Sequence, residues 1–493
     1  MNAYPADFPT VHPAGILDTR EARRARGLAL RKTLPRGGHA DWSPPAGRAD
    51  PVAVLERQGA SRIASLLPVR YARMAASPFA FLRGAAVVMA ADLAQTAWAG
   101  PRVQSCGDCH LANFGSYASP EGVPVFDIND FDETLPAPFE WDIKRLGASL
   151  VLAGHETGLS DDAARGLAVA AAQAYAGEMA RLAPLTPLEI WTHRIDLGAA
   201  IDGFASKRVR QRVQALLAAR LDAARRHFGL VADDSGAPTL QEKPPLVMRL
   251  PENDDAVRSA FARYVATQPP ERGILLTRYR LRDVIFKVVG VGSVGTFCAI
   301  GLFATADGDS LLLQIKEAQD SVLAPFAGAS AFRNQGQRVV TGQRIMQAAP
   351  DAFLGWTHTA GQDEAEDTAH ALSGAGRQFY VRRVKDTRLA AIGTEIAQEG
   401  LPDYALLCGR TLARAHARTG DVVALAAYLG RGRSFADAIG GFSVLYAEQT
   451  RRDWTLFKAA IAAGRLPCWS GTAPGGNGGG GRGAGGAGTG SGA

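Results

Sequence analysis

Three things are scarce in this sequence: cysteine, long apolar runs and long runs of one charge. Its five cysteines are an odd number spread over 493 residues, which excludes a disulfide framework and is typical of a reducing compartment. No run reaches about 18 apolar residues, so we expect no membrane-spanning helix. The segment Met1–Pro9 has no basic region followed by an apolar one, so we expect no secretory signal. We therefore predict a cytoplasmic protein with no membrane partner.

The net charge is small as well. The chain carries 54 Lys and Arg against 48 Asp and Glu, a formal charge of +6. Such a surplus suits phosphate-bearing ligands but does not indicate a nucleic-acid partner. The most basic segment, Arg20–Arg26, is interrupted by alanines and a glutamate, and a solvated helix face is its simplest interpretation.

Composition and periodicity divide the chain into five parts. Residues 1–50 are rich in Pro, Gly and Arg and predict an irregular basic arm. Apolar residues at helical spacing predict a mainly helical lobe over 51–270. Residues 275–390 predict a lobe of strands, and 395–470 return to a helical pattern that completes the first lobe. Residues 471–493 are nearly all small and predict a disordered tail.

Some local structure can also be predicted. Asp142 precedes a helical pattern that runs to Leu182, so we expect it to cap a helix N-terminus. An Asp-Gly-Asp turn at 307–309 separates two of the four segments that predict strands. Those segments are Val284–Val289, Thr296–Ile300, Leu311–Ile315 and Phe379–Val384.

The densest polar chemistry lies between residues 106 and 133. Cys106, Cys109 and His110 form the C-x-x-C-H pattern of c-type haem attachment, but that attachment normally takes place outside the cytoplasm. A zinc site is disfavoured because no second Cys/His pair lies at suitable spacing. A thioredoxin-like pair would require a helix start, which the pattern does not predict.

The carboxylates and amides of this segment favour a different chemistry. Asp108 and Asn113 are five positions apart, and Asp130 follows a short predicted strand. Phosphoryl transfer needs a carboxylate to orient the attacking hydroxyl, and an Asn and an Asp to hold magnesium. Kinase catalytic loops supply these as D-x-x-x-x-N followed by a strand and turn. His110 is expected to orient this loop. The alternative is that these polar residues only cap loops and turns.

A glycine-rich segment, Gly290–Gly295, has the G-x-G-x-x-G pattern that dinucleotide folds and kinases share. A dinucleotide site requires a helix directly after the third glycine, and the residues that follow predict none, although Glu317 stands where its acidic residue would be. A kinase-like hairpin requires a lysine at the end of the third strand, where Lys316 lies. We favour the hairpin, with loop amides over the phosphates and Lys316 holding two of them. A purely structural turn is a further alternative.

Nine segments of the chain resemble one family over nearly the whole sequence. They are Pro68–Met74, Ser77–Gly84, Cys106–Gly115, Asp127–Thr134, Glu140–Leu146, Val288–Gly295, Gln314–Ala318, Gln337–Arg344 and Leu412–Ala417. By these segments the sequence resembles the bacterial domain of unknown function 2252 family. The motifs in turn look like those of aminoglycoside-phosphotransferase-type kinases, with Cys106 where their catalytic loop usually begins with His.

That similarity implies a role for each motif residue. Asp108 would be the catalytic base, and Asn113 and Asp130 the magnesium ligands. The phosphates of ATP would be bound by the glycine-rich loop and the lysine, through Gly290, Gly292, Ser293, Gly295 and Lys316.

The order of these motifs is inverted relative to such kinases, because the catalytic loop precedes the glycine-rich loop. A circular permutation explains the inversion, since the termini of compact domains often lie close together. We therefore predict an α+β, protein-kinase-like two-lobed fold, permuted so that the helical lobe comes first and an antiparallel strand lobe later. This requires Asp108 and Lys316 to lie across one cleft.

The glutamate that usually pairs with the lysine is missing, because Asp320 is the only acid between Ala318 and Pro350. Gln337, Gln343 or Glu317 are possible substitutes.

Several cations and one histidine stand in the family-like segments. The cations could anchor substrate or phosphate, although salt bridges to the acids of residues 127–133 are the favoured alternative; these cations are Arg70, Arg73, Arg83, Lys144 and Arg145. His416 is expected to be a paired core histidine.

The sequence thus predicts an ATP- and magnesium-dependent phosphotransferase acting on an unknown hydroxyl-bearing acceptor, either a small molecule or a protein. One alternative is a nucleotide-binding pseudokinase or regulatory module, suggested by the missing glutamate. A second is an NAD(P)-dependent oxidoreductase.

Overall fold

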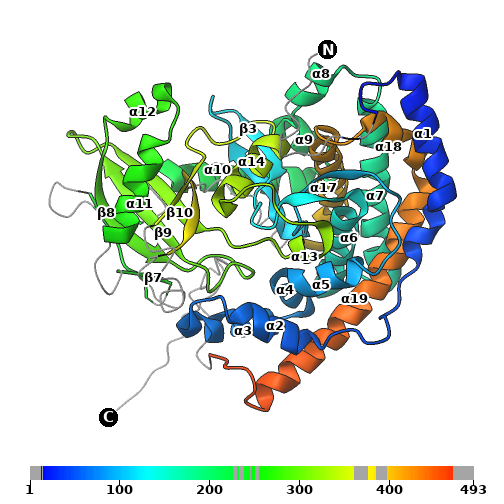
Figure 1. Ribbon diagram of the computed structural model, residues 1–493, viewed down its shortest axis with the longest axis horizontal. Helices are drawn as coiled ribbons and strands as arrows, with labels where there is room; N and C mark the ends of the chain where they lie inside the picture. Colours follow the sequence, from blue (N-terminus) through cyan, green and yellow to red (C-terminus); the bar gives the residue numbers. More distant parts are fainter. Residues whose placement is uncertain are drawn as a thin grey trace, which may run out of the picture.

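The computed structural model describes residues 13, 15–225, 230–232, 238–244, 246–249, 255–359, 376–384 and 397–469. The predicted tail at 471–493 lies outside these residues. The fold is α+β, as predicted: both ends of the chain form a helical part, and its middle forms an antiparallel sheet beside it (Figure 1). In the part of the chain that is described, no helix is long and apolar enough to cross a membrane.

Four helices form the centre of the helical part: α6 (Phe139–Glu156), α7 (Asp161–Leu182), α17 (Ala397–Ala417) and α19 (Arg433–Ala462). Every residue of α6 from Phe139 to Gly154 is buried, because the other three helices and α4 surround it. The helices approach closely where glycine replaces a side chain. A Cβ on Gly409 would lie 2.1 Å from the carbonyl oxygen of Ala171, so α17 and α7 pack backbone to backbone there.

The N-terminal arm is not irregular throughout, and that prediction was wrong for residues 20–33. They form α1 (Arg20–Thr33), which begins at the N-cap Thr19 and has Arg31 and Lys32 in its last turn. The prolines and most glycines of the arm lie outside this stretch. Helix α1 packs on α18 (Val422–Leu429) at the edge of the molecule (Figure 1), where a Cβ on Gly27 would lie 2.1 Å from the carbonyl oxygen of Ala424. The helical interpretation of Arg20–Arg26 is thus confirmed, and tertiary packing stabilises the helix that extends from it to Thr33.

Short helices connect the helical part to the sheet. The chain passes through α2 (Pro51–Gly59), α3 (Leu67–Ala75), α4 (Pro78–Gly84) and α5 (Ala86–Leu93) before it enters the polar segment. Prolines at the first helical positions of α2 and α4 suit those positions, whose N–H groups need no intrahelical partner. The other helices are η1 (Arg36–Ala40), η2 (Ala64–Leu66), η3 (Leu111–Asn113), α8 (Pro187–Thr192), α9 (Leu197–Asp202), α10 (Lys207–Arg225), α11 (Asp255–Ala266), α12 (Pro270–Leu276), α13 (Ala324–Ala327) and α14 (Gln335–Met346).

The large sheet has six strands in the order β11-β12-β10-β9-β8-β7, with every neighbouring pair antiparallel. Its strands are β7 (Val247–Met248), β8 (Arg280–Lys287), β9 (Cys298–Ala304), β10 (Ser310–Glu317), β11 (Gly355–His358) and β12 (Gln378–Arg383). Each of the four predicted strand segments overlaps one of them. The sheet begins at Val247, earlier than the predicted start at 275.

An aromatic core holds helix α11 on this sheet. Phe261 of the helix meets Phe303 of β9 edge to face, with ring centroids 5.4 Å apart. Phe297, just before β9, packs in the same way on Phe286 of β8 and Phe379 of β12. These contacts give the sheet its own apolar core, separate from that of the helical part.

Three two-stranded ribbons complete the fold. β1 (Arg102–Ser105) pairs with β4 (Leu135–Pro138), and β2 (Phe114–Ala118) pairs with β3 (Pro124–Ile128). A third ribbon joins β5 (Val231–Ala232) to β6 (Thr239–Leu240). The first two ribbons hold the polar segment 106–133 between the helical part and the sheet.

Candidate functional site

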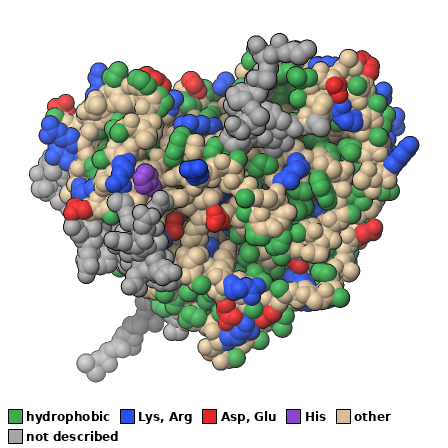
Figure 2. Space-filling view, in the orientation of Figure 1, with side chains coloured by type: hydrophobic (Ala, Val, Ile, Leu, Met, Phe, Trp, Pro, Cys, Tyr) green, Lys and Arg blue, Asp and Glu red, His purple; other side chains and the backbone are tan. Residues whose placement is uncertain are grey.

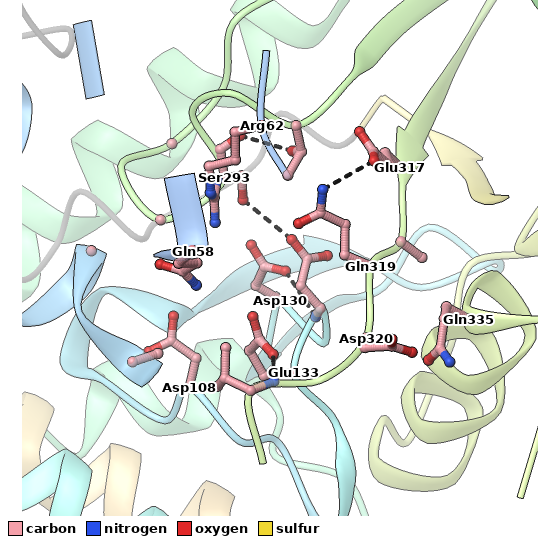
Figure 3. Close-up of a pocket in the computed structure, with 18 of the residues that line it drawn as sticks. Gln58, Arg62, Asp108, Asp130, Glu133, Ser293, Glu317, Gln319, Asp320 and Gln335 are labelled. Carbon is pink, nitrogen blue, oxygen red and sulfur yellow. Dashed lines mark hydrogen bonds between the residues drawn. The ribbon is translucent and has the colours of Figure 1, made fainter. Parts of the chain in front are cut away.

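A cavity of about 790 Å³ lies between the helical part and the sheet. It is lined by the three segments that the sequence singled out: the loop with Asp108, the acidic turn Asp130–Glu133 and the glycine-rich loop. In the close-up, Asp108 and Asp130 lie across the space from Ser293 (Figure 3). Residues far apart in the sequence therefore share one concave site.

Asp108 is held from the helical side by a buried arginine. Arg145 of α6 donates from Nε to Oδ1 of Asp108 at 2.6 Å, and the Arg145 side chain is only 3% exposed. The second carboxylate oxygen lies 3.8 Å from Nε2 of His110. Because 22% of the Asp108 side chain remains exposed, one oxygen is fixed and the other faces the cavity.

His110 is buried on the same wall. Burial lowers its pKa to about 4, although the nearby carboxylate of Asp108 opposes that shift. The imidazole is therefore neutral at pH 7. Its backbone N–H donates to the carbonyl oxygen of Asp108 at 2.8 Å, which closes the tight turn that presents Asp108.

Asn113 joins the loop to the acidic turn. Its Nδ2 donates to the carbonyl oxygens of Asp108 and Asp130, at 3.1 and 3.0 Å, and its Oδ1 accepts from the N–H of Asp130 at 2.7 Å. The amide oxygen keeps a second lone pair, and Asn113 lines the cavity. Asn113 therefore sets the spacing between Asp108 and Asp130.

Lys316, at the end of β10, pairs with the acidic turn. Its Nζ donates to Oδ2 of Asp132 and lies 3.5 Å from Oδ2 of Asp130. The Lys316 side chain is only 2% exposed. Burial alone would lower the lysine pKa, but the two aspartates hold it above its ordinary value. Asp132 thus takes the place of the carboxylate partner that the sequence did not supply.

Asp132 also binds two other groups. It accepts from the hydroxyl of Tyr380 at 2.8 Å and from the hydroxyl of Ser293 at 3.2 Å. Burial raises the Asp132 pKa, as does the charge of Asp130, while Lys316 opposes both. One side chain therefore joins the acidic turn, the sheet and the glycine-rich loop.

The three residues considered as substitutes for the glutamate lie elsewhere. Glu317 pairs with Arg377 at 2.6 Å and accepts from the N–H of Phe297. Gln343 donates to Gln347 of the same helix. Gln337 lies in the first turn of α14, where its N–H donates to the side chain of the N-cap Asn334.

The glycine-rich loop lies in a hairpin between β8 and β9, which pair antiparallel. The helix that a dinucleotide site needs does not follow it, because Cys298–Ala304 is a strand. Gly290 and Gly295 have φ angles of 70° and 93°, a region that favours glycine. A Cβ on Gly292 would lie 3.0 Å from the carbonyl oxygen of Arg83, so the loop tip approaches the helical part closely.

Arginines of the helical part hold the carbonyl side of this loop. Arg73 donates to the carbonyl oxygen of Gly290 at 2.5 Å, and Arg70 donates to that of Gly292. Arg62 donates to the carbonyl oxygen of Val294 at 2.7 Å. Arg70 and Arg73 thus donate to carbonyl groups of the loop rather than to the acids of residues 127–133.

The backbone N–H groups at the start of the loop have no partner among the described residues. The N–H groups from Gly290 to Ser293 donate to no acceptor among the described residues. All four residues line the cavity. Consecutive N–H groups without a partner form a concavity that suits an anion.

A family model described as "Uncharacterized protein conserved in bacteria (DUF2252)" matches residues 62–460. The chain belongs to the DUF2252 family. No curated protein and no solved structure matched it. The DUF2252 match begins at Arg62 and covers the cavity wall except Gln58 and Ser61.

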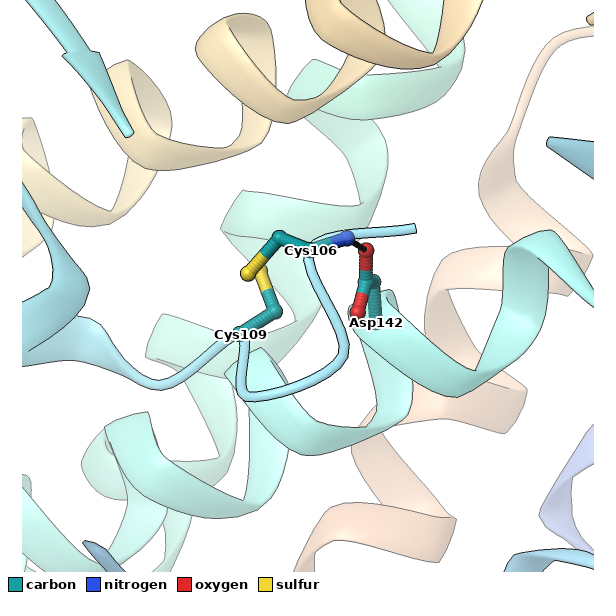
Figure 4. Close-up of side chains that lie close together, drawn as sticks. All are labelled: Cys106, Cys109 and Asp142. Atoms are coloured by element: carbon teal, nitrogen blue, oxygen red, sulfur yellow. Dashed lines mark hydrogen bonds between the residues drawn. The ribbon is translucent and has the colours of Figure 1, made fainter. Parts of the chain in front are cut away.

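Two of the cysteines of this DUF2252 chain lie together beneath the loop. Cys106 and Cys109 are buried and not joined by a disulfide, and their sulfur atoms lie within 4.8 Å of a carboxylate oxygen of Asp142 (Figure 4). Burial raises the pKa of both thiols, that of Cys106 to about 11. Without a metal ion, both thiols are therefore protonated at pH 7.

Asp142 does not cap α6, whose N-cap is Pro138, so that prediction was wrong. Its carboxylate instead accepts from the N–H groups of Cys106 and Gly107, at 2.7 and 3.0 Å. It also pairs with Nε2 of His416 at 3.1 Å. His416 is buried and bonded through both nitrogens, as predicted, since its Nδ1 meets the hydroxyl of Tyr175. The loop N–H groups and His416 therefore bind a carboxylate that the local sequence pattern assigned to a helix N-cap.

The sequence did not predict the partners of two site residues. Arg145 and Asp132 stand in family-like segments, but their spacing does not show that Arg145 meets Asp108 and Asp132 meets Lys316. Arg62 lies outside those segments. Asn129 directly precedes the acidic turn and lines the cavity. Its position, as a polar residue directly after the buried end of β3, could have predicted a place in the site.

Proposed function

We propose that this DUF2252 chain is an ATP- and magnesium-dependent phosphotransferase with a permuted kinase-like arrangement. One observation carries the proposal. Lys316 meets Asp130 and Asp132 across 186 and 184 positions of sequence. The two aspartates line a cavity together with Asp108 and with loop amides that have no acceptor among the described residues. Those are the parts that phosphoryl transfer requires.

The residues present fit both groups that the reaction needs. Four N–H groups without a protein acceptor suit the phosphates of ATP. Oxygens of Asp130 and Asn113 suit magnesium, which prefers one or two carboxylates together with substrate phosphates and water. Magnesium, when bound, would neutralise phosphate charge during transfer.

The other roles follow from the geometry. Arg145 fixes one oxygen of Asp108, and the free oxygen is the base for the acceptor hydroxyl. In the transfer a bond forms between the acceptor oxygen and the γ-phosphorus. The bond from that phosphorus to the β-phosphate oxygen breaks, and the acceptor proton passes to Asp108. Asp132 keeps Lys316 charged and oriented.

A nucleotide-binding module without turnover is a second candidate. It is favoured by the ion pair between Asp108 and Arg145, which occupies one of the two oxygens of the base. Release of ADP from bound ATP distinguishes the two candidates.

Thermal unfolding with magnesium-ATP tests the proposal. Ligand at about one hundred times its dissociation constant adds about 2.7 kcal/mol of stability. We expect a shift that needs magnesium, disappears in Asp130→Asn and persists in Asp320→Asn, which makes the same change at another aspartate of the cavity wall. No shift in the wild type would overturn the proposal, and a shift with NADH alone would favour an oxidoreductase.

A further inference from the structure

The cavity wall beside Asp108 holds polar atoms that nothing in the described structure satisfies. Nε of Arg83, Nδ1 of His110 and both amide atoms of Asn129 are buried without a hydrogen-bond partner. All three residues line the 790 Å³ cavity. An unsatisfied buried donor or acceptor costs about 1–3 kcal/mol. Four such atoms on three residues of one wall therefore point to a ligand that supplies their partners.

These side chains surround the predicted base. The guanidinium carbon of Arg83 lies 5.8 Å from the ring centre of Phe79, and the imidazole of His110 meets the same ring edge to face at 6.4 Å. His110 in turn lies 3.8 Å from Asp108. Arg83 and His110 thus share one side of the base, formed by α4 and the loop.

Three cations at the cavity have acidic partners: Arg145 is paired with Asp108, Lys316 with Asp132, and Arg377 with Glu317. Among the described residues Arg70 has no ion pair there but donates to carbonyl groups. Arg83 is partly buried and forms no ion pair or hydrogen bond with any residue in the described ranges, and burial lowers its pKa. Partial burial of a cation without such a partner is costly, and an anionic ligand would supply the partner.

The side chain of Arg83 lies over Phe79, one turn earlier in α4, with its guanidinium carbon 5.8 Å from the ring centre. His110, which is 3.8 Å from Asp108, packs on the same ring. The loop amides that have no acceptor among the described residues supply positive potential on the nucleotide side. Because Arg83 shares Phe79 with the histidine beside the proposed base, it lies on the acceptor side.

We infer that the acceptor is a small hydroxyl compound with a carboxylate or phosphate group, which pairs with Arg83 while Asn129 and His110 hydrogen-bond its hydroxyls. This inference rests on the proposed phosphotransferase function. Arginine suits such a group because its planar fork donates two parallel hydrogen bonds to it.

Binding of matched probes tests the inference. Calorimetry on the full chain, with saturating magnesium and a non-hydrolysable ATP analogue, compares glycerol with D-glycerate and glycerol 1-phosphate, which add one carboxylate or one phosphate. We expect the wild type to bind at least one charged probe about tenfold more tightly than glycerol. The probe with the larger gain in affinity over glycerol shows whether the site prefers a carboxylate or a phosphate.

Two variants and one control locate the effect. Arg83→Met should remove that preference while the analogue still binds, and Asn129→Asp should weaken the charged probes about tenfold through repulsion. Arg333→Met removes an exposed cation of the same cavity and should change affinities less than twofold. Arg83→Met leaves no partner unpaired, so we expect it to fold.

The inference fails if no charged probe binds better than glycerol, or if Arg83→Met binds every probe as the wild type does. It also fails if Arg83→Met weakens the ATP analogue rather than the probes, because Arg83 would then belong to the nucleotide side. Failure of the wild type to bind the analogue would instead overturn the proposed function. Probe titrations without nucleotide would then show whether an anion site exists at Arg83.

Discussion

Two aspartates on either side of the same loop have opposite environments. Asp142, below the loop, is 2% exposed and its carboxylate accepts from two backbone N–H groups and from His416. Asp108, within the loop, is 22% exposed, has one oxygen on Arg145 and has its histidine at 3.8 Å. His416 is bonded through both ring nitrogens, whereas Nδ1 of His110 has no partner.

The contrast separates a structural carboxylate from a chemical one. A buried polar network with every group satisfied fixes conformation. A group that keeps an unused oxygen towards a cavity remains available to a ligand. In this protein Asp142 holds the loop in place, and the loop in turn holds Asp108 at the cavity.

The largest effect is expected at Asp108. Asp108→Asn removes the base but keeps the size of the side chain, so ADP release should fall about 10²- to 10⁴-fold. The free energy of unfolding should change by only about 1 kcal/mol, because Asn can still accept from Arg145. Retained turnover would show that Asp108 is not the base.

The same substitution at Asp142 should chiefly lower the free energy of unfolding. Asp142→Asn leaves donors of Cys106, Gly107 or His416 without a carboxylate, and unfolding in urea should show a loss of about 3 kcal/mol. Asp161→Asn is the control, because Asp161 pairs with His155 at 2.8 Å while 89% exposed. It should change stability by less than about 0.5 kcal/mol. Equal losses of stability in Asp142→Asn and Asp161→Asn would contradict the structural role of Asp142.

A third histidine extends the comparison to pH. His39 is buried against Tyr428, with Lys144 nearby, and burial lowers its pKa to about 3 from an ordinary 6.5. Since the unfolded chain takes up the proton first, stability is full above pH 6.5 and is lost as pH falls towards 3. Between pH 7 and 4 the wild type should lose on the order of 2–3 kcal/mol more than His39→Gln. Parallel curves would mean that His39 does not titrate in this way.

The smallest effect is expected at Ser293. Its hydroxyl donates to Asp132 at 3.2 Å in a partly buried position. Ser293→Ala should weaken the ATP analogue by only about threefold, because the lost bond joins Ser293 to Asp132, which keeps its bonds to Lys316 and Tyr380. Ser310→Ala, at the other end of the lysine strand, serves as the control and should have no effect.

The sequence predicted what depends on short-range pattern. Alternating and apolar segments located the strands up to Lys316, and the polar segment at 106–133 was recognised as the richest in chemistry. Contacts between residues far apart in the sequence could not be predicted. The missing glutamate could be noted from the sequence, but its replacement by Asp132 depends on a contact across 184 positions. The same holds for Asp142, whose partners lie in a loop some 35 positions earlier and in α17.

The arginine contacts to the glycine-rich loop also determine when the site can assemble. Arg70 and Arg73 precede their carbonyl acceptors by 217 to 222 positions. At about 5–20 residues per second, a ribosome needs roughly 10–45 s to deliver those acceptors after the arginines. During that interval the two guanidinium groups lack these acceptors, and α17 and α19, which complete the helical part, are not yet made. A chain arrested before residue 290 would therefore lack both the glycine-rich side of the site and the helices that support its other side.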